Sequence, residues 1–302
     1  MYIVLTIFML YISSYAFIRI RNKDKFSRVR QLSDFSTFMV IFNVPAYLLS
    51  LVPIRPFIEG KYYPELDLIE ENWEVIRDEA LALYASGHVD VGDDLPASSF
   101  YKNGRWKSFY LKSFDNNIPS AYELAPKTMA LIDQIPTMNM ALFAALMPGK
   151  ELKKHHDPFA FTMRYSMGLS TPNSIDCGLI VDGDDRIWRD GESFIFDETY
   201  MHSAYNNTDK VRLILMTDVA RPLRLKFIQK AYYNFGRFFN RLFAIDNVDQ
   251  TYSGIGNKLG KGILAYSAMM KRFKHINKPL YVLTKVIVTF SLIGFISYKL
   301  IQ

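Results

Sequence analysis

The chain has 302 residues, of which 50% are hydrophobic and 15% aromatic. This composition excludes an intrinsically disordered protein, and the single cysteine, Cys177, excludes a disulfide framework or a cysteine-based zinc cluster. The charge is unevenly spread, because residues 19–30 contain six basic and one acidic residue and residues 221–278 contain twelve and two. An acidic central region between two basic ones favours an anionic partner, either a nucleic acid or a membrane surface.

Apolar runs beside the basic stretches decide between these partners. Residues 1–18 contain no charged residue and predict a transmembrane anchor. The alternative, a cleaved signal peptide, lacks the preceding basic residue and the small-residue cleavage site that it requires. Residues 280–298 predict a second span. Residues 35–54 are also uncharged, but their prolines and the positive-inside rule favour a re-entrant or interfacial segment over a full crossing.

The region from 223 to 278 interleaves basic and aromatic residues. Such a pattern can stack on nucleic-acid bases, and it equally suits a helix that lies in a lipid interface. Because an apolar span follows directly, we expect an anionic membrane surface as the partner and no nucleic acid. An amphipathic helix packed on its own domain is the alternative for part of this region.

Between the basic regions, two helices are predicted to precede a β domain. Apolar residues spaced by three or four predict a helix over 63–86, and a second helix over 120–134 can be kinked or restarted by Pro126. From about residue 139 the pattern changes to seven short apolar runs separated by turn residues. This cadence predicts an antiparallel sandwich or jelly roll, and hence a mainly β fold class with flanking helices and membrane segments.

One cluster in the β region has the composition of a metal site. His155 and Asp157 lie two residues apart, so on an extended chain they share one face while His156 points to the other. His202 follows 47 residues after His155. Two histidines and one carboxylate form the facial triad that holds Fe(II) and leaves positions open for other ligands. The alternative is a turn histidine beside an aspartate cap.

Arg212 opens an otherwise apolar run, 211–219. A charge inside such a run needs a partner, and the guanidinium fork of arginine matches a carboxylate. In an iron dioxygenase, that carboxylate would be the distal end of 2-oxoglutarate. The alternative is an arginine at the end of a strand that reaches solvent.

Together these residues resemble a known family. The runs Pro148-Gly, His155-His-Asp-Pro, Trp188-Arg-Asp-Gly, Asp197-Glu-Thr-Tyr-Met-His and Arg212-Leu-Ile-Leu are similar to the aspartyl/asparaginyl β-hydroxylases, and in particular to their bacterial lipid A 2-hydroxylase branch. The resemblance implies a double-stranded β-helix dioxygenase that uses Fe(II), 2-oxoglutarate and O2. It also implies that His155, Asp157 and His202 are the catalytic iron ligands and that Arg212 binds 2-oxoglutarate.

The resemblance further implies a substrate and a location. The reaction would be hydroxylation of carbon 2 of a fatty acyl chain on lipid A or a lipid A precursor, by a domain that faces the cytoplasm at the bacterial inner membrane. No protein partner is inferred from the sequence. The peptide-hydroxylating members have glycine where this chain has Asp157, which favours the lipid branch. The alternatives are a peptidyl aspartyl/asparaginyl β-hydroxylase and a non-catalytic membrane-anchored β-barrel binding module.

Two departures from the family pattern concern the cosubstrate. Ser166 stands where the family commonly has histidine, and Ala144 lies near the place of a family serine, so both are expected to affect 2-oxoglutarate affinity. Arg164 is expected to face substrate or cosubstrate, with a plain exterior cation as the alternative. Trp73, Trp106 and Trp188 are expected in the core or an interface, and His88 and His275 in structural or interfacial positions.

These expectations divide the chain into five regions. They are an N-terminal membrane anchor over 1–58, a helical lead-in over 59–135, the dioxygenase core over 136–222, a basic membrane-surface region over 223–278 and a C-terminal transmembrane segment over 279–302.

Overall fold

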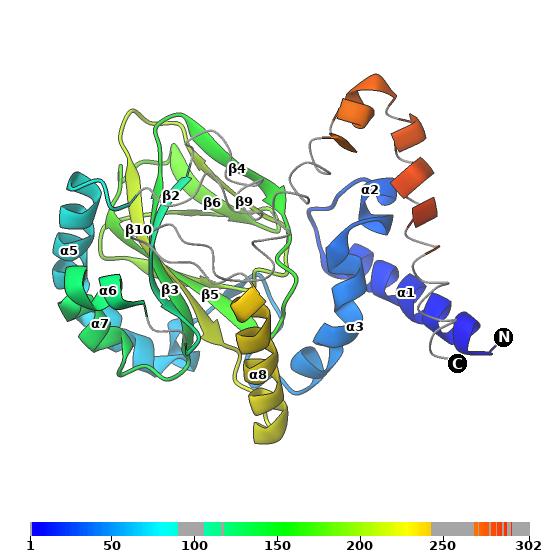
Figure 1. Cartoon of the computed structure of the whole chain (residues 1–302), viewed down its shortest axis with the longest axis horizontal. Helices are drawn as coiled ribbons and strands as arrows, with labels where there is room; N and C mark the ends of the chain where they lie inside the picture. The colour runs from blue at the N-terminus through cyan, green and yellow to red at the C-terminus, as the bar shows by residue number, and fades with distance from the viewer. Residues whose placement is uncertain are drawn as a thin grey trace.

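The structure is a computed structural model that describes residues 2–89, 106–115 and 118–242 and parts of 269–291. Its centre is a pair of antiparallel sheets, which confirms the prediction of a mainly β domain (Figure 1). In spatial order, the six-stranded sheet contains β1 (Phe57–Ile58), β8 (Ser193–Phe196), β5 (Thr162–Ser170), β10 (Arg212–Ala220), β3 (Met138–Leu146) and β2 (Trp106–Ser113). The four-stranded sheet contains β4 (Lys150–His155), β9 (His202–Asn206), β6 (Cys177–Val181) and β7 (Asp184–Ile187).

Alternation along β10 creates two separate apolar layers. Leu213 and Leu215 belong to a large cluster on the outer face of the six-stranded sheet, whereas Ile214 and Met216 belong to a smaller cluster shared with the four-stranded sheet. Because successive side chains of a strand point to opposite faces, one strand can serve both layers. Arg212 has the parity of Ile214 and Met216, so its side chain lies between the sheets.

Short helices cover the outer layer at one side of the sandwich (Figure 1). The helix predicted over 63–86 is divided at Asn72 into α4 (Asp67–Glu71) and α5 (Trp73–Ala85), and it is preceded by a 3-10 turn, η2 (Pro64–Leu66). The helix predicted over 120–134 is divided into α6 (Pro119–Leu124) and α7 (Pro126–Ile132), with the restart at Pro126.

The predicted boundaries of the β core are too narrow. The region from 59 to 135 was predicted to be helical, but it contains β2, and β1 also precedes residue 136. β2 pairs with β3, with Trp106 in the inner layer and Phe109 and Leu111 in the outer one. A register irregularity between Tyr110 and Lys112 interrupts its alternation, which is why the period-2 pattern is weak in the sequence.

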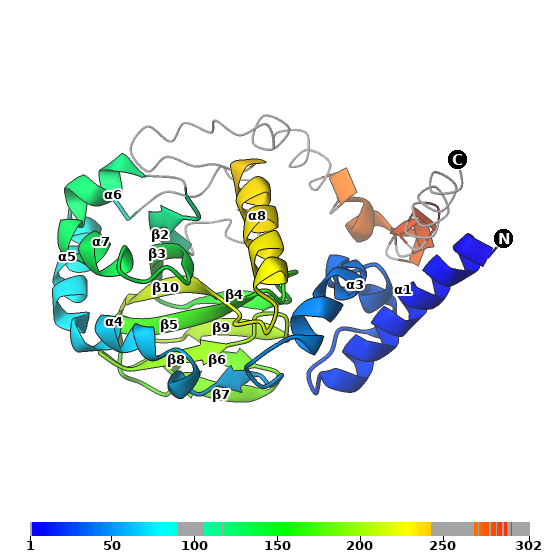
Figure 2. The same cartoon turned by 90° about the horizontal axis from the view of Figure 1, so that it is seen from below.

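Three N-terminal helices lie on the side of the sandwich opposite α5, α6 and α7 (Figures 1 and 2). They are α1 (Tyr2–Arg21), α2 (Arg28–Leu32) and α3 (Phe35–Leu48). Strand β1 and a short 3-10 helix, η1 (Gly60–Tyr62), follow them in the chain. Asn43, the polar residue of the apolar run 35–54, is buried: its side chain donates to the Pro158 carbonyl (2.9 Å) and accepts from the Ala160 amide (2.9 Å). This pair of hydrogen bonds anchors α3 to the β domain.

The membrane segments have different outcomes. Within the described part of the chain, no helix has the length and hydropathy needed to cross a membrane. The span predicted at 1–18 is therefore not confirmed, and most of the span predicted at 280–298 lies outside the described residues. The region 223–278 is described only to residue 242 and from residue 269. Its first part is α8 (Lys226–Leu242), which packs aromatic side chains on Phe159 and Phe161 of the β domain.

Candidate metal centre

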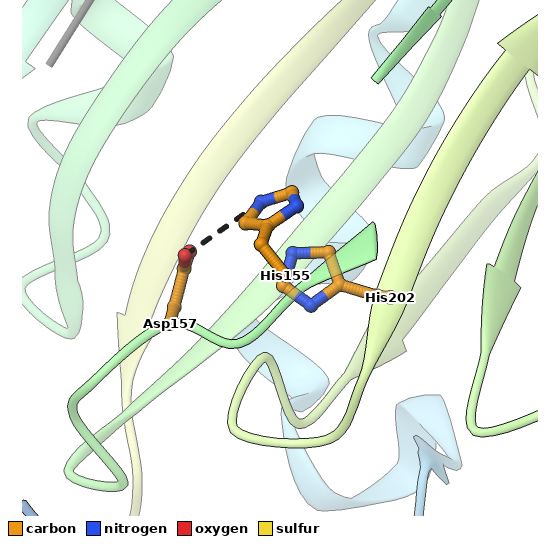
Figure 3. Close-up of side chains that lie close together, drawn as sticks. All are labelled: His155, Asp157 and His202. Atoms are coloured by element: carbon orange, nitrogen blue, oxygen red, sulfur yellow. Dashed lines mark ion pairs between the residues drawn. The ribbon is translucent and has the colours of Figure 1, made fainter. Parts of the chain in front are cut away.

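The two histidines of the predicted triad are cross-strand neighbours. The pairing of β4 with β9 places His155 directly opposite His202, with their ring centroids 4.1 Å apart. Asp157 lies just beyond the end of β4, where its backbone N–H donates to the Glu198 carbonyl (2.9 Å). The three side chains converge, and their ligand atoms all lie within 4.8 Å of one another (Figure 3). The structure therefore brings together the three residues that the sequence analysis selected.

Hydrogen bonds to carbonyl groups orient both rings. The Nδ1 atom of His202 lies 3.0 Å from the Tyr200 carbonyl oxygen, and that of His155 lies 2.7 Å from the Lys153 carbonyl oxygen. Each contact holds a proton on Nδ1, so Nε2 keeps its lone pair for a metal. The Nε2 atom of His202 is buried and has no hydrogen-bond partner among the residues that the structure describes. Burial, with the nearby His155 ring, lowers the pKa of His202 to about 3, which keeps it in the neutral form that binds metals.

His156 lies apart from this group, as strand alternation predicts. Its Nδ1 atom is 3.0 Å from the Thr199 carbonyl oxygen, and its ring meets the Phe26 ring edge-on. It is therefore placed as a contact between the β domain and the segment that follows α1.

Arg164 is surrounded by carboxylates. Its Nη1 atom lies 3.1 Å from Asp157 Oδ2, its Nη2 atom 2.5 Å from Glu198 Oε2 and its Nε atom 2.9 Å from Asp218 Oδ1. Burial alone would raise the pKa of Asp157, but the Arg164 charge and the two histidines outweigh it and lower that pKa. Since only 14% of its side chain is exposed, Arg164 is not the exterior cation considered as the alternative.

Arg212 has no such partners. It is 1% exposed, its Nε and Nη2 atoms have no hydrogen-bond partner, and no ion pair within 4.0 Å involves it among the described residues. Its guanidinium lies 4.2 Å from the centre of the Trp188 ring and 5.2 Å from that of Trp106. Burial lowers the pKa of Arg212 to about 10. A buried cation between two indoles, with unused donors, can pair with an anion, so Arg212 forms a candidate anion site.

One cavity connects the metal centre with this anion site. His155, His202, Ser166 and Arg212 all line it, and it encloses about 470 Å³ of atom-free space, its open mouth included. Ser166 accepts a hydrogen bond from the indole N–H of Trp188 (2.8 Å), so the residue that replaces the usual histidine lies in the cavity wall. Ala144 is fully buried in the inner apolar layer.

The sequence analysis placed two tryptophans in the core without a further role. Trp106 and Trp188 are buried, but they also form the walls around Arg212. This role could have been predicted from the family pattern, because Trp188 belongs to its Trp-Arg-Asp-Gly run. Hydrophobicity alone does not separate Trp188 from an ordinary core residue.

A β sandwich in which two histidines and a carboxylate converge beside a buried arginine has the ligand set of a candidate metal centre, and the sequence comparisons place it among the hydroxylases. Residues 70–222 match the family model described as Aspartyl/Asparaginyl beta-hydroxylase. The chain belongs to this family. An ornithine lipid ester-linked acyl 2-hydroxylase from Rhizobium tropici is 31% identical over 199 residues, which cover 65% of this chain and 68% of that protein.

Other relatives are longer proteins. The aspartyl/asparaginyl beta-hydroxylase of Homo sapiens is 26% identical over 68% of this chain and 28% of its own length. Aspartate beta-hydroxylase domain-containing protein 2 of Homo sapiens is 27% identical over 58% of this chain and 50% of its own length. The chain thus spans half or less of these two human relatives. Among solved structures, a cupin 2 conserved barrel domain protein from Salinispora arenicola has 10% identity and a TM-score of 0.28, and the match covers 44% of this chain and 86% of that one.

Proposed function

We propose that this protein is an Fe(II)- and 2-oxoglutarate-dependent hydroxylase that acts on carbon 2 of a fatty acyl chain of a membrane lipid. The observation that carries the proposal is that His155 and His202 line the same cavity as Arg212, and that the ligand atoms of Asp157 lie within 4.8 Å of those of the two histidines. His155, Asp157 and His202 would hold the iron, since two imidazoles and one carboxylate suit Fe(II) and leave coordination positions open. The orphaned Nε2 atom of His202 fits this assignment.

Each group in the cavity has a separate task. Bound iron would activate O2 while 2-oxoglutarate is oxidised to succinate and CO2. Arg212 would bind the distal carboxylate of 2-oxoglutarate, because its free donors match that group. Trp106 and Trp188 would keep water from this ion pair, and Ser166 would offer a hydroxyl oxygen at the cavity wall. Arg164 was predicted to face substrate or cosubstrate. It lines the cavity, but its guanidinium is already ion-paired with three carboxylates, so this role stays a prediction.

The acidic residues at the proposed metal centre support a lipid over an aspartyl peptide as the substrate. Asp157, Glu198 and Asp218 already surround Arg164, so an aspartyl side chain that entered here would add a fourth carboxylate. A neutral acyl carbon adds none. We propose lipid A or its precursor as the substrate, as the family resemblance implies, and ornithine lipid as the second candidate, because the Rhizobium tropici relative is named for it.

An exposed apolar patch supports contact with a bilayer. The patch surrounds the junction between the end of α3 and the start of α8, where the Leu51 amide donates to the Pro222 carbonyl and the Arg224 amide to the Leu49 carbonyl. Its large side chains are each at least 41% exposed: Phe42, Leu48, Leu51, Leu225 and Phe227. Exposed basic residues adjoin it, namely Arg224, Lys226 and Lys230. Apolar side chains beside cations suit an anionic lipid surface, which we propose to be the cytoplasmic face of the bacterial inner membrane.

The reaction is tested by supplying the purified full chain with Fe(II), ascorbate and 2-oxoglutarate and measuring succinate. We expect succinate formation to rise with vesicles that contain lipid A or ornithine lipid, and not with an aspartyl or asparaginyl peptide. Asp157→Ala should abolish the lipid-dependent turnover, whereas His156→Ala, at the neighbouring position outside the triad, should retain most of it. Turnover that depends on the peptide, or none with either lipid, would reject the lipid proposal.

The surface is tested by flotation with phosphatidylglycerol-containing vesicles. Leu48→Asp combined with Phe227→Asp should reduce the bound fraction at least tenfold, since each buried apolar side chain contributes about 1.5–3 kcal/mol. The matched control is Ile175→Asp, because Ile175 is 74% exposed in the loop before β6, far along the chain from the patch. An equal loss in the control, or none in the double variant, would contradict the assignment of the patch.

A further inference from the structure

We propose that Arg164 is a positioning residue that fixes the metal-binding orientation of Asp157. The inference rests on the metal centre proposed above and assigns to Arg164 a role that acts through another residue. The two carboxylate oxygens of Asp157 point to different partners. Oδ1 lies 3.8 Å from His155 Nε2, on the side of the clustered ligand atoms, whereas Oδ2 lies 3.1 Å from Arg164 Nη1. One oxygen is thereby left for a metal and the other is held by the guanidinium.

The guanidinium itself is fixed from two other directions. Nη2 pairs with Glu198, in the segment between β8 and β9, and Nε pairs with Asp218 on β10, whose Cα lies opposite that of Arg164 in the sheet register. An arginine presents its donors in one rigid plane, so pairing at two edges fixes the direction of the third. The three ion pairs together hold the guanidinium with its Nη1 atom 3.1 Å from Asp157 Oδ2.

The surrounding acids explain why Asp157 needs this support. Asp157 is anchored to the Glu198 carbonyl through its backbone, close to the Glu198 carboxylate, and Asp218 approaches the same guanidinium. Without Arg164, Asp157 would lose the cation that lies against its Oδ2 atom, beside two further acidic side chains. Partners that orient metal ligands from behind typically account for 10- to 100-fold in metal affinity.

The test is an equilibrium titration of the full chain with Co(II), followed by its visible absorption, without cosubstrate or turnover. Arg164→Lys keeps the charge but offers a single point donor, and we expect it to weaken Co(II) binding about 10- to 100-fold. In an Asp157→Ala background the same substitution should have no further effect on Co(II) affinity. The matched control is Arg189→Lys, an exposed arginine paired with Glu192, which should bind Co(II) as the unsubstituted protein does.

The outcomes separate this inference from the function on which it rests. Unchanged Co(II) affinity in Arg164→Lys, or an equal loss with and without Asp157, would overturn the positioning role while leaving the metal centre intact. A weaker 2-oxoglutarate affinity with unchanged Co(II) affinity would assign Arg164 to the cosubstrate and also overturn it. Failure of the unsubstituted protein to bind Co(II) would reject both proposals. If Arg164→Lys does not fold, the charge-balanced variant Arg164→Gln/Asp218→Asn should show the same loss and the same dependence on Asp157.

Discussion

Two arginines in this protein are equally buried but differ in their partners, and their replacement by methionine should have opposite consequences. Arg212 is 1% exposed and pairs with no carboxylate in the described part of the chain, whereas Arg221 is 0% exposed and lies 2.7 Å from Asp197 through Nη2. Arg221 also donates through Nε to the Ala160 carbonyl. We expect Arg212→Met to leave the stability of the cosubstrate-free protein nearly unchanged, and Arg221→Met to destabilise it strongly.

The magnitudes follow from the local charges. The pKa of Arg212 is lowered from 12.5 to about 10, so the charged form costs the folded protein roughly 3 kcal/mol, at 1.36 kcal/mol per pKa unit. The contacts with the faces of Trp106 and Trp188 return roughly 1–2 kcal/mol each. These contributions nearly cancel, so Arg212→Met should change the free energy of unfolding by no more than about 1 kcal/mol. Arg221→Met leaves Asp197 buried without its main partner, which costs about 3–5 kcal/mol.

The assay is urea unfolding at pH 7 followed by far-ultraviolet circular dichroism, repeated with 2-oxoglutarate and Co(II). A ligand at 100 times its Kd stabilises a protein by about 2.7 kcal/mol, and Arg212→Met should lose this gain. If Arg212→Met destabilised the protein as much as Arg221→Met does, Arg212 would have an internal partner and would not be an anion site.

Three further changes test the packing and the hydrogen bonds around the site. Gly168→Ala should destabilise the protein by roughly 2 kcal/mol or more in urea unfolding, because a Cβ there would lie 2.1 Å from the Arg189 carbonyl oxygen; Gly60→Ala, which meets nothing within 4 Å, is the control. Ser166→Ala should cost about 1–3 kcal/mol, because the buried Trp188 indole N–H loses its acceptor, and an unchanged urea midpoint would contradict this. Burial raises the pKa of Asp197, but the charges of Arg221 and Arg21 lower it by more, so its pKa in the folded protein is below the unfolded value. A lowered folded-state pKa stabilises the protein above the unfolded pKa, and this stabilisation is lost in acid. The difference in free energy of unfolding between Asp197→Asn and the unsubstituted protein should therefore shrink as the pH falls below about 4. A difference that stays constant from pH 7 to pH 3 would refute the last expectation.

The sequence predicted the triad from the two-residue spacing of His155 and Asp157 and from the family resemblance, although β4 ends at His155 and Asp157 lies beyond it. It could not predict that His155 lies opposite His202, because the register between strands that are 47 residues apart depends on turns and on packing across the whole sheet. The environment of Arg164 was hidden for the same reason. Its three partners come from separate segments of the chain, at residues 157, 198 and 218.

The apolar pattern of the sequence also fails to reveal residues that have a second role besides packing. Trp188 fits a packing pattern equally well as a core residue and as the wall of an anion site. Asn43 interrupts an apolar run and so weakened the case for a membrane span, but its side chain is used to bond the backbone on either side of Phe159. Only the tertiary contacts distinguish these roles.

The attachment of the N-terminal helices has a practical consequence for work on this enzyme. Asn43 on α3 bonds the segment that follows Asp157, and Arg21 at the end of α1 donates to the Thr199 hydroxyl (2.8 Å), three residues before His202. Both segments that carry the proposed metal ligands are therefore braced by the same helical unit. A shortened protein that begins at the β sandwich, made to ease purification, would lose both braces, so weak metal binding by such a fragment would reflect the missing helices and not the chemistry of the site.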